Sequence, residues 1–361
     1  MKIIRVLPSM DFGGIERGVY DFSKKVIQLG HKIIIISSYG KFLPELMEKG
    51  IKWYQVNLDK KNLKTFINGY IKLKKIIKEE KPDIIHFQSR FPCWIGYFVM
   101  KKFPEIPYIT SIHSFSPFPL YTKSTGKGDL VIVVSKALKE YAIKKLKVPE
   151  NKIRVIYNGI DIDEFFIDRE FEKKDIWKIG MIGRFSILKG HYYFIESINI
   201  LIKRKNENIK GIIYGSGSKS LKKIIEKWIE EKNLEGFIEI VVGKNSKEIM
   251  KEIDILVVPS IEPEGFGRVI VEGMVSGIPS IATNIGAVPE IIENGKTGFL
   301  VEPKNSLQIA ECIEKLIKNH YLYIEISKNS QKESIKRFNL DKMVNETLKV
   351  YEESIFLKKR K

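Results

Sequence analysis

Two glutamates with seven residues between them are the side chains of this sequence best placed to do chemistry. Glu264 and Glu272 lie on either side of a short loop that contains Gly265, Phe266 and Gly267. Paired carboxylates act as acid and base, or as acid and nucleophile, when both face one bond. They can also bind the two ends of a long ligand. The spacing of the pair decides between these roles.

The residues after the loop, 268–275, predict a helix, which places Glu272 about a turn and a half inside it. At ~1.5 Å of rise per residue, the two carboxylates then lie up to ~12 Å apart. Retaining glycoside hydrolases need ~5 to 5.5 Å and inverting ones ~6.5 to 9.5 Å. We therefore expect the pair to hold a long ligand whose phosphates lie on the helix N-terminus, as in a nucleotide diphosphate sugar. Two solvated surface glutamates are the alternative, which the neighbouring strand and glycines disfavour.

Two cations follow the first strand expected in the second half of the chain. Arg184 and Lys189 lie in a segment bounded by Gly183 and Gly190. Arginine binds phosphate through a two-pronged fork and lysine through a point charge. Such cations can stabilise the negative charge that grows on a departing diphosphate. A pair of surface cations is the alternative in a chain as basic as this one.

His113 and a glycine pair mark the ends of strands in the first half. His113 follows residues 108–112 at the end of a predicted strand, where a neutral or protonated imidazole that titrates near neutral pH can bind a sugar or a phosphate. His86 lies near the end of the predicted strand 83–87, and a structural role is favoured there. Gly13 and Gly14 stand where a strand turns into a helix, and glycine lets a ligand approach the backbone. A plain tight turn also explains these glycines.

Alternating strands and helices must position these residues. The runs that predict strands are residues 2–7, 32–37, 83–87, 108–113 and 130–135, and then 178–183, 211–215, 238–242, 253–259 and 280–283. Helices are predicted over 16–29, 62–80 and 340–358. This alternation predicts an α/β protein with two doubly wound, Rossmann-like parallel-sheet domains that face each other across a cleft.

A charged stretch, residues 168–175, separates the two halves. The expected domains are residues 1–167 and 168–337. The last segment, 338–361, predicts a helix that either closes the second domain or packs back on the first.

Composition narrows the class of protein. No apolar run approaches the ~20 residues of a membrane span, and the first residues read as a strand rather than a signal peptide, which predicts a cytoplasmic protein. Cys93 and Cys312 suggest neither a disulfide scaffold nor a zinc site.

The net charge is +18 and uneven. Residues 1–165 hold 29 lysines and arginines against 16 aspartates and glutamates, a net +13, and the remainder has 33 against 28, a net +5. The charge indicates either an anionic partner, such as a membrane surface, or only the base composition of the genome. Nucleic acid is not expected as a partner, because no nucleic-acid-binding motif accompanies the charge.

Taken together, these segments resemble the retaining glycosyltransferases of family 4, which have the two-domain GT-B fold. The resemblance covers nearly the whole chain, and it implies that residues 1–167 lie on the acceptor side and that residues 168–337 bind the nucleotide sugar. Five motifs carry it, in order: Gly13-Gly14-Ile15-Glu16, then His113, then Asn158-Gly159-Ile160-Asp161, then Gly183-Arg184-Phe185 with Lys189-Gly190, and last Glu264 with Glu272.

The resemblance implies a role for each motif residue. It implies His113 and Glu264 near the reacting centre, and it implies that Gly13, Gly14, Arg184, Lys189, Asn245, Glu264, Gly265, Phe266, Gly267 and Glu272 bind substrate. It also implies front-face substitution, in which the departing phosphate oxygen takes the acceptor's proton, with no metal and no cofactor. Arg268 and Gly273 depart from the usual pattern, and we expect neither to touch the acidic pair.

The expected function is transfer of a hexose from a nucleotide diphosphate sugar, for example a UDP-sugar, to a hydroxyl of a saccharide or a lipid-linked saccharide. Such transfer belongs to the synthesis of cell-surface polysaccharide or glycolipid, in the cytoplasm or at the inner face of the membrane. A sugar-nucleotide epimerase of the same fold is one alternative. A non-catalytic subunit that binds carbohydrate or a membrane surface is the other.

Overall fold

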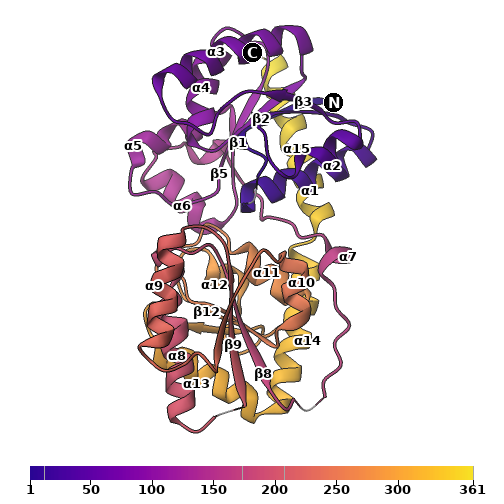
Figure 1. Ribbon diagram of the computed structural model, residues 1–361. Helices are drawn as coiled ribbons and strands as arrows, with labels where there is room; N and C mark the ends of the chain where they lie inside the picture. Colours follow the sequence, from indigo (N-terminus) through magenta and orange to yellow (C-terminus); the bar gives the residue numbers. More distant parts are fainter. Residues whose placement is uncertain (12, 173, 207, 361) are drawn as a thin grey trace. The chain divides into compact units, whose positions relative to one another are not determined.

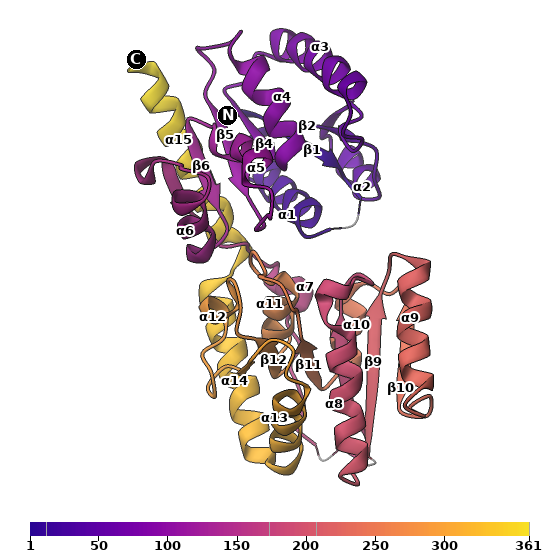
Figure 2. The same ribbon diagram turned by 90° about the vertical axis from the view of Figure 1, so that its left-hand side faces the viewer.

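The computed structural model describes residues 1–11, 13–172, 174–206 and 208–360 and divides the chain into two units (Figures 1 and 2). The first unit comprises Met1–Gly159 together with Leu340–Lys361, and the second comprises Ile160–Asn339. The first unit is therefore built from both ends of the chain.

The first unit contains a seven-stranded sheet in the order β3-β2-β1-β4-β5-β6-β7. Every neighbouring pair is parallel. The strands are β1 (Lys2–Ser9), β2 (Lys32–Ser38), β3 (Lys52–Gln55), β4 (Ile84–Gln88), β5 (Tyr108–Ile112), β6 (Leu130–Val133) and β7 (Ile153–Val155). Because β1 is central and the strand order reverses beside it, the carboxyl ends of β1 and β4 form a switch point, where ligands bind in such folds.

The helices of the first unit are α1 (Gly14–Gln28), α2 (Leu43–Glu48), α3 (Leu63–Glu80), α4 (Arg90–Met100), α5 (Pro119–Thr122), α6 (Lys136–Lys144) and α15 (Leu340–Lys359). Short 3-10 turns span Lys123–Gly126 and Glu150–Lys152. α15 belongs to the core of this unit, because Val344 and Tyr351 are fully buried in one apolar cluster with Ile3 and Phe22. The C-terminal helix thus packs on the first unit.

The second unit contains a six-stranded parallel sheet in the order β10-β9-β8-β11-β12-β13. The strands are β8 (Trp177–Ile182), β9 (Ile209–Gly215), β10 (Ile238–Val242), β11 (Ile255–Val258), β12 (Ser280–Thr283) and β13 (Phe299–Val301). The order reverses between β8 and β11, so these two strands form the switch point of this sheet.

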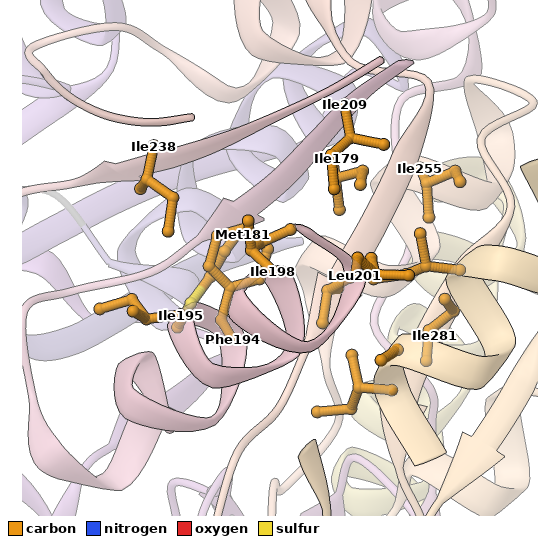
Figure 3. Close-up of a cluster of buried hydrophobic side chains, with 14 of the residues drawn as sticks. Ile179, Met181, Phe194, Ile195, Ile198, Leu201, Ile209, Ile238, Ile255 and Ile281 are labelled. Carbon is orange, nitrogen blue, oxygen red and sulfur yellow. The ribbon is translucent and has the colours of Figure 1, made fainter. Parts of the chain in front are cut away.

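The helices of the second unit are α7 (Ile162–Phe165), α8 (His191–Lys203), α9 (Lys219–Glu230), α10 (Ser246–Glu252), α11 (Arg268–Val275), α12 (Val288–Ile291), α13 (Ser306–Lys318) and α14 (His320–Arg337), with a 3-10 turn over Ile187–Lys189. Figure 3 shows the core that holds β8 and α8 together. Ile179 and Met181 of β8 face Phe194 and Ile198 of α8 there, all at most 1% exposed. This packing fixes the loop between β8 and α8.

The expected fold class is confirmed, and the strand list and the boundary between the units differ from the expectation. β3, β7 and β13 are additional strands, each only three or four residues long. Residues 160–167 belong to the second unit rather than the first. The reason is that α7, inside this segment, contacts α11 and α10, and the Phe165 carbonyl accepts a hydrogen bond from Ser276 Oγ at 2.7 Å.

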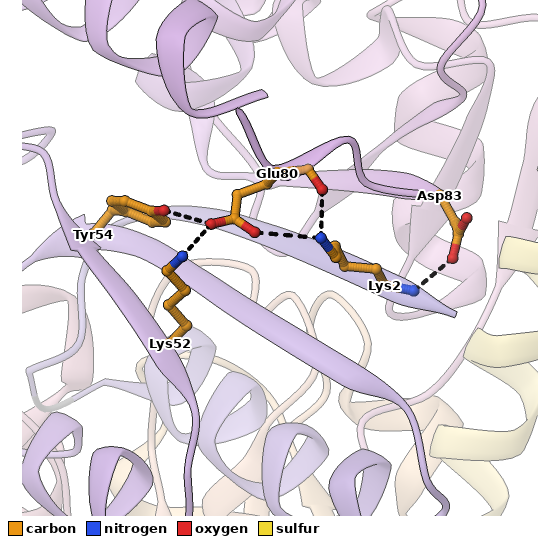
Figure 4. A network of polar contacts seen from close by, with 5 residues as sticks. All are labelled: Lys2, Lys52, Tyr54, Glu80 and Asp83. Carbon is orange, nitrogen blue, oxygen red and sulfur yellow. Dashed lines mark hydrogen bonds and ion pairs between the residues drawn. The ribbon is translucent and has the colours of Figure 1, made fainter. Parts of the chain in front are cut away.

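A polar network at the amino ends of β1 and β3 ties α3 to the first sheet (Figure 4). Glu80, the last residue of α3, accepts hydrogen bonds from Lys52 Nζ and Tyr54 Oη at one carboxylate oxygen. Its second oxygen accepts from Lys2 Nζ at 3.4 Å, and Asp83 accepts from the Lys2 amide at 2.6 Å. The network lies at the sheet edge opposite to the carboxyl ends of the strands.

Candidate active site

The loop after β11 holds Glu264 in a fixed position. Ser260 Oγ donates a hydrogen bond to Glu264 Oε1 at 2.6 Å, and Thr283 Oγ1 donates to the Ser260 carbonyl at 2.7 Å. The Ala287 amide donates to the Glu264 carbonyl at 2.9 Å. Glu264 is therefore supported from the neighbouring strand β12 and the segment that follows it.

Lys189 reaches the same carboxylate from the loop after β8. Its Nζ lies 2.5 Å from Glu264 Oε1. The turn that carries it is tied to the β11 loop, because the Ile261 amide donates to the Leu188 carbonyl at 2.9 Å. Gly190 makes this approach possible: it has a φ of +74°, and a Cβ there would lie 1.9 Å from the Pro259 carbonyl oxygen.

Half of the Glu264 carboxylate is unused. Lys189 and Ser260 both bind Oε1, and Oε2 has no partner within the part of the chain that the structure describes. The Glu264 and Lys189 side chains are 20% and 30% exposed. An ionised carboxylate oxygen that is neither paired nor fully exposed can accept hydrogen bonds from ligand hydroxyls.

Backbone amides at the start of α11 add an anion-binding element. Gly267 caps the helix in the left-handed region with a φ of +94°, which glycine adopts without strain. Its carbonyl accepts from the Ile270 amide at 3.0 Å, which closes the first turn. Among the described residues, the amides of Gly265, Gly267 and Val269 have no acceptor. Such open amides at the positive end of a helix bind phosphate well.

Phe266 plays a structural part in this loop. It is only 4% exposed, and its ring packs edge-on against Phe338 with the centroids 5.6 Å apart. Its side chain anchors the turn, so a contribution of Phe266 to ligand binding would come through the backbone of this loop.

Glu272 is buried and paired with Arg268, which corrects an expectation from the sequence. Arg268 Nε donates to Glu272 Oε1 at 2.8 Å, and the two side chains are 9% and 5% exposed. The expectation that Arg268 does not touch the acidic pair is therefore wrong. The i,i+4 spacing on one helix brings the two side chains together.

Arg184 and Asn245 occupy the rim of the second unit. Arg184 is exposed and makes no hydrogen bond or ion pair with any residue that the structure describes. Asn245 is exposed and caps α10, accepting from the Glu248 amide at 3.0 Å. A helix cap accounts for Asn245 without a ligand, so its contact with a nucleobase stays a prediction. Over the described ranges, no group of three or more His, Cys, Asp and Glu side chains is arranged to hold a metal ion.

His113 lies in the first unit, just beyond the carboxyl end of β5. It lines a cavity of about 30 Å³ together with Gly14, and it also lines a pocket of about 300 Å³. Burial, aided by the positive charge of Arg5, lowers the pKa of His113 from 6.5 to about 4. The expectation that His113 titrates near neutral pH is wrong, because the folded protein holds a neutral imidazole. Gly13 directly precedes α1.

Comparison with known proteins now decides the family. Residues 163–333 match the model "Glycosyl transferases group 1", and residues 12–164 match the model "Glycosyltransferase Family 4". An uncharacterised glycosyltransferase of Methanocaldococcus jannaschii is 32% identical over 98% of this chain and 99% of its own length. The chain belongs to glycosyltransferase family 4. The expected resemblance is thereby confirmed.

Two further proteins are similar to this family 4 enzyme over nearly its whole length. The capsular polysaccharide biosynthesis glycosyltransferase CapM of Staphylococcus aureus is 30% identical over 92% of this chain and 94% of its own. The structure of Anabaena HepE in complex with UDP and glucose has a TM-score of 0.84 at 21% identity, covering 97% of this chain and 99% of the other. At this identity the second likeness shows the fold alone.

Three features of this candidate site were not predicted from the sequence. Ser260 stands at the end of a predicted strand, and its bond to Glu264 depends on the turn that follows. Ser111 lies inside a predicted strand, and its bond to His113 has no signal in the sequence. The pairing of Arg268 with Glu272, by contrast, had a signal in the sequence, because opposite charges four residues apart on a helix face each other.

Proposed function

We propose that this family 4 glycosyltransferase moves a hexose from a nucleotide diphosphate sugar to a hydroxyl of a saccharide or lipid-linked saccharide, with retention of the anomeric configuration. The half-used carboxylate of Glu264, next to Lys189 and the open amides of Gly265 and Gly267, carries the proposal. A sugar diphosphate presents hydroxyls to a carboxylate and phosphate oxygens to cations and amides. Both kinds of partner meet in this one loop cluster.

The charges in the second unit fit the departure of a nucleoside diphosphate. Lys189 and Arg184 would offset the charge that grows on the leaving phosphate, and the open amides of the α11 start would bind its oxygens. In this proposal the leaving oxygen takes the acceptor's proton, so no carboxylate attacks and no metal or cofactor takes part. Glu264 Oε2 binds hydroxyls of the donor sugar, Glu272 the ribose, and Asn245 the nucleobase.

The first unit would serve the acceptor. Its pocket of about 300 Å³ is lined by Lys61, Arg90, Asp59 and several hydroxyl side chains, a lining that suits a polar ligand. Gly14 and the neutral imidazole of His113 line the adjoining cavity, and Gly13 leads into this segment. CapM, the S. aureus relative, is named for capsular polysaccharide biosynthesis, which supports polysaccharide synthesis as the setting.

A panel of nucleotide sugars tests the donor. Incubation with UDP-, GDP-, ADP- and dTDP-sugars should give thermal stabilisation and nucleoside diphosphate release with one of them. The Anabaena structure with UDP and glucose makes UDP-glucose the first donor to try. Stabilisation without release, with every acceptor tried, would favour a binding subunit. Conversion of the donor sugar without an acceptor would favour an epimerase.

Two further measurements test the mechanism once a donor is known. The anomeric coupling constant in the NMR spectrum of the first-formed product reports retention or inversion. Activity that persists unchanged in excess EDTA supports a reaction without a divalent metal, whereas loss that Mg²⁺ or Mn²⁺ restores would overturn that part of the proposal.

We also propose that the first unit docks on an anionic membrane surface through α3. Leu63, Ile67 and Ile71 are 74%, 51% and 59% exposed and lie on one face of this helix at four-residue spacing. Exposed lysines share the helix: Lys64, Lys72, Lys74, Lys75 and Lys78. The apolar side chains can enter the boundary between headgroups and acyl chains. Each lysine near anionic headgroups contributes about 1 kcal/mol of binding free energy.

Co-sedimentation with vesicles tests this docking. Vesicles of equal parts phosphatidylglycerol and phosphatidylcholine should bind the protein, and pure phosphatidylcholine or high salt should release it. Ile67→Gln should weaken binding, whereas Ile224→Gln, an exposed isoleucine on the lysine-rich helix α9, should not. Equal effects of both substitutions would contradict the proposal.

The described residues include no helix that is both long and apolar enough to cross a lipid bilayer. Both cysteines, Cys93 and Cys312, are free thiols, which supports the proposed location on the cytoplasmic side, where thiols stay reduced.

A further inference from the structure

Five polar side chains form a continuous row inside the first unit and end at His113. Arg5 lies on β1, Tyr351 on α15, His86 on β4 and Ser111 on β5. The first four side chains are at most 4% exposed. Each side chain forms a hydrogen bond with the next. The donor and the acceptor of each bond can be assigned from the chemistry of the groups.

Arg5 sets the direction because a guanidinium group can only donate. Its Nε and Nη2 lie 3.3 and 2.9 Å from Tyr351 Oη, so the phenol oxygen accepts from both. The proton of the phenol is then free for His86 Nδ1, which lies 2.7 Å away. His86 therefore accepts at Nδ1.

The same reasoning continues from His86 to His113. A neutral imidazole that accepts at Nδ1 carries its proton on Nε2, and His86 Nε2 lies 2.8 Å from Ser111 Oγ. Ser111 accepts this bond and directs its own proton to His113 Nε2, at 3.0 Å. His113 is thus left with its proton on Nδ1.

The opposite direction leaves groups unsatisfied. If His113 donated from Nε2, one of two arrangements would follow. Either Ser111 Oγ would accept a hydrogen bond from both imidazoles, or Ser111 would donate to His86 Nε2, and His86 would then donate from Nδ1 to Tyr351 Oη. The hydroxyl proton of Ser111 or of Tyr351 would then lack an acceptor, although these residues are 1% and 0% exposed. A buried hydroxyl without a partner loses its hydrogen bonds to water and gains none in the protein. The direction of hydrogen-bond donation that starts at Arg5 is therefore favoured.

We propose that Arg5, Tyr351, His86 and Ser111 are positioning residues that fix His113 as the Nδ1–H tautomer. His113 then acts in the pocket of the first unit as a hydrogen-bond donor to an oxygen of the bound saccharide or phosphate, and not as a base through Nδ1. In the described chain, Nδ1 has no acceptor of its own. The role at the ligand rests on the proposed transferase function, whereas the tautomer does not.

Nitrogen-15 NMR of the unliganded protein tests the tautomer directly. In a long-range ¹H–¹⁵N spectrum of histidine-labelled protein, the signals of His113 are those that disappear in His113→Gln. We expect a protonated Nδ1 and an unprotonated Nε2. Ser111→Ala and Tyr351→Phe should each shift His113 toward a mixture of tautomers, and Ser111→Thr, which keeps the hydroxyl, should retain the original one.

Tyr323→Phe is the matched control for Tyr351→Phe. Tyr323 is likewise buried, and its hydroxyl donates to the Asp254 carbonyl at 3.2 Å, but it lies in the second unit and outside the row. A structural cost of losing a buried phenol hydroxyl should appear in both variants. A change in the His113 tautomer should appear only in Tyr351→Phe.

Kinetics with the donor found above then tests the role at the ligand. We expect Ser111→Ala and Tyr351→Phe to lower kcat/KM by about tenfold, the scale of one hydrogen bond, and Tyr323→Phe to leave it within about twofold. A protonated Nε2 in the parent protein, or a tautomer unmoved by both Ser111→Ala and Tyr351→Phe, would overturn the inference. If the NMR spectrum showed the assigned tautomer but no donor and acceptor gave transfer, only the proposed function would be contradicted.

Discussion

Two glutamates of this protein, Glu80 and Glu264, each bind lysine, and they differ in how completely their oxygens are used. Glu80 employs both carboxylate oxygens, with Lys52 and Tyr54 on one and Lys2 on the other. Glu264 employs only Oε1, with Lys189 and Ser260. A carboxylate whose oxygens are all bound by protein holds the fold together, whereas one with an oxygen to spare can receive a ligand.

Their places in the sheets support the same distinction. Glu80 lies at the amino ends of β1 and β3, away from the edge where ligands bind parallel sheets. Glu264 follows the carboxyl end of β11, next to the strand at which the sheet order reverses. Both are lysine-paired carboxylates, so position and the number of bound oxygens, not residue type, separate the structural pair from the one proposed to bind substrate.

Removing the lysine of the pair proposed to bind substrate should have the largest effect. Lys189→Met should lower kcat by about 100-fold to 1,000-fold, because the proposed mechanism loses a preorganised cation at the departing diphosphate. The measurement is nucleoside diphosphate release at saturating donor. Lys52→Met, the matched change at Glu80, should leave kcat per folded molecule unchanged, and equal losses in both variants would contradict the distinction.

Glu264→Gln should have the next largest effect. The amide keeps one oxygen for Lys189 and Ser260 but replaces the open acceptor with a donor, so kcat/KM should fall by about 10-fold to 100-fold. Urea unfolding should show a stability within about 1 kcal/mol of the parent, because the ion pair is partly exposed. A loss of stability large enough to explain the lost activity would instead indicate that Glu264, like Glu80, has a structural role.

Glu80→Gln should show the reverse pattern. It weakens three hydrogen bonds at a side chain that is 10% exposed, so we expect a loss of about 1 to 3 kcal/mol in the free energy of unfolding. Urea denaturation followed by circular dichroism measures this loss. Transfer activity per folded molecule should not change, and a selective loss of activity would break the comparison.

The smallest effect concerns how the free energy of unfolding depends on pH. The difference in this free energy between the parent and Glu80→Gln should change with pH. Hydrogen bonds from Lys52 and Tyr54 lower the pKa of Glu80 from 4.5 to about 2. As the pH falls through this window, the unfolded chain binds the proton first, so the contribution of Glu80 is complete above pH 4.5 and fades toward pH 2. Unfolding free energies of the two proteins should converge over this range.

Histidines set a background that both proteins share. Burial lowers the pKa values of His113 and His191 from 6.5 to about 4, so both proteins should lose stability as the pH falls from 6.5 to 4. Subtracting the unfolding free energy of Glu80→Gln from that of the parent removes this shared contribution of the histidines. A difference that vanished already between pH 6.5 and 4.5 would contradict the assignment to Glu80.

The sequence predicted what depends on local pattern and missed what depends on partners far along the chain. Apolar runs of β-branched residues predicted most of the strands, and the loop of Gly265 and Gly267 predicted the helix start. β3 and β13 were missed because they are short and lie at sheet edges, where β3 is only partly apolar. The tyrosine that meets His86 is 265 residues away and has no local signal.

Charge states were the least predictable property of the site. The sequence predicted site roles for His113 and Glu272 from their positions. In the structure, burial favours a neutral imidazole at His113, and Arg268 pairs with Glu272. Desolvation and pairing depend on how the surrounding segments pack, which residue spacing alone does not contain.

The two-ended construction of the first unit has a consequence for how the chain folds during synthesis. The second unit is one continuous segment and is complete once residue 339 has emerged. The first unit lacks Val344 and Tyr351 of its core until α15 is made. Domains usually fold in the order in which they emerge, but the core of the first unit is complete only after α15. We therefore expect the second unit to fold ahead of the first.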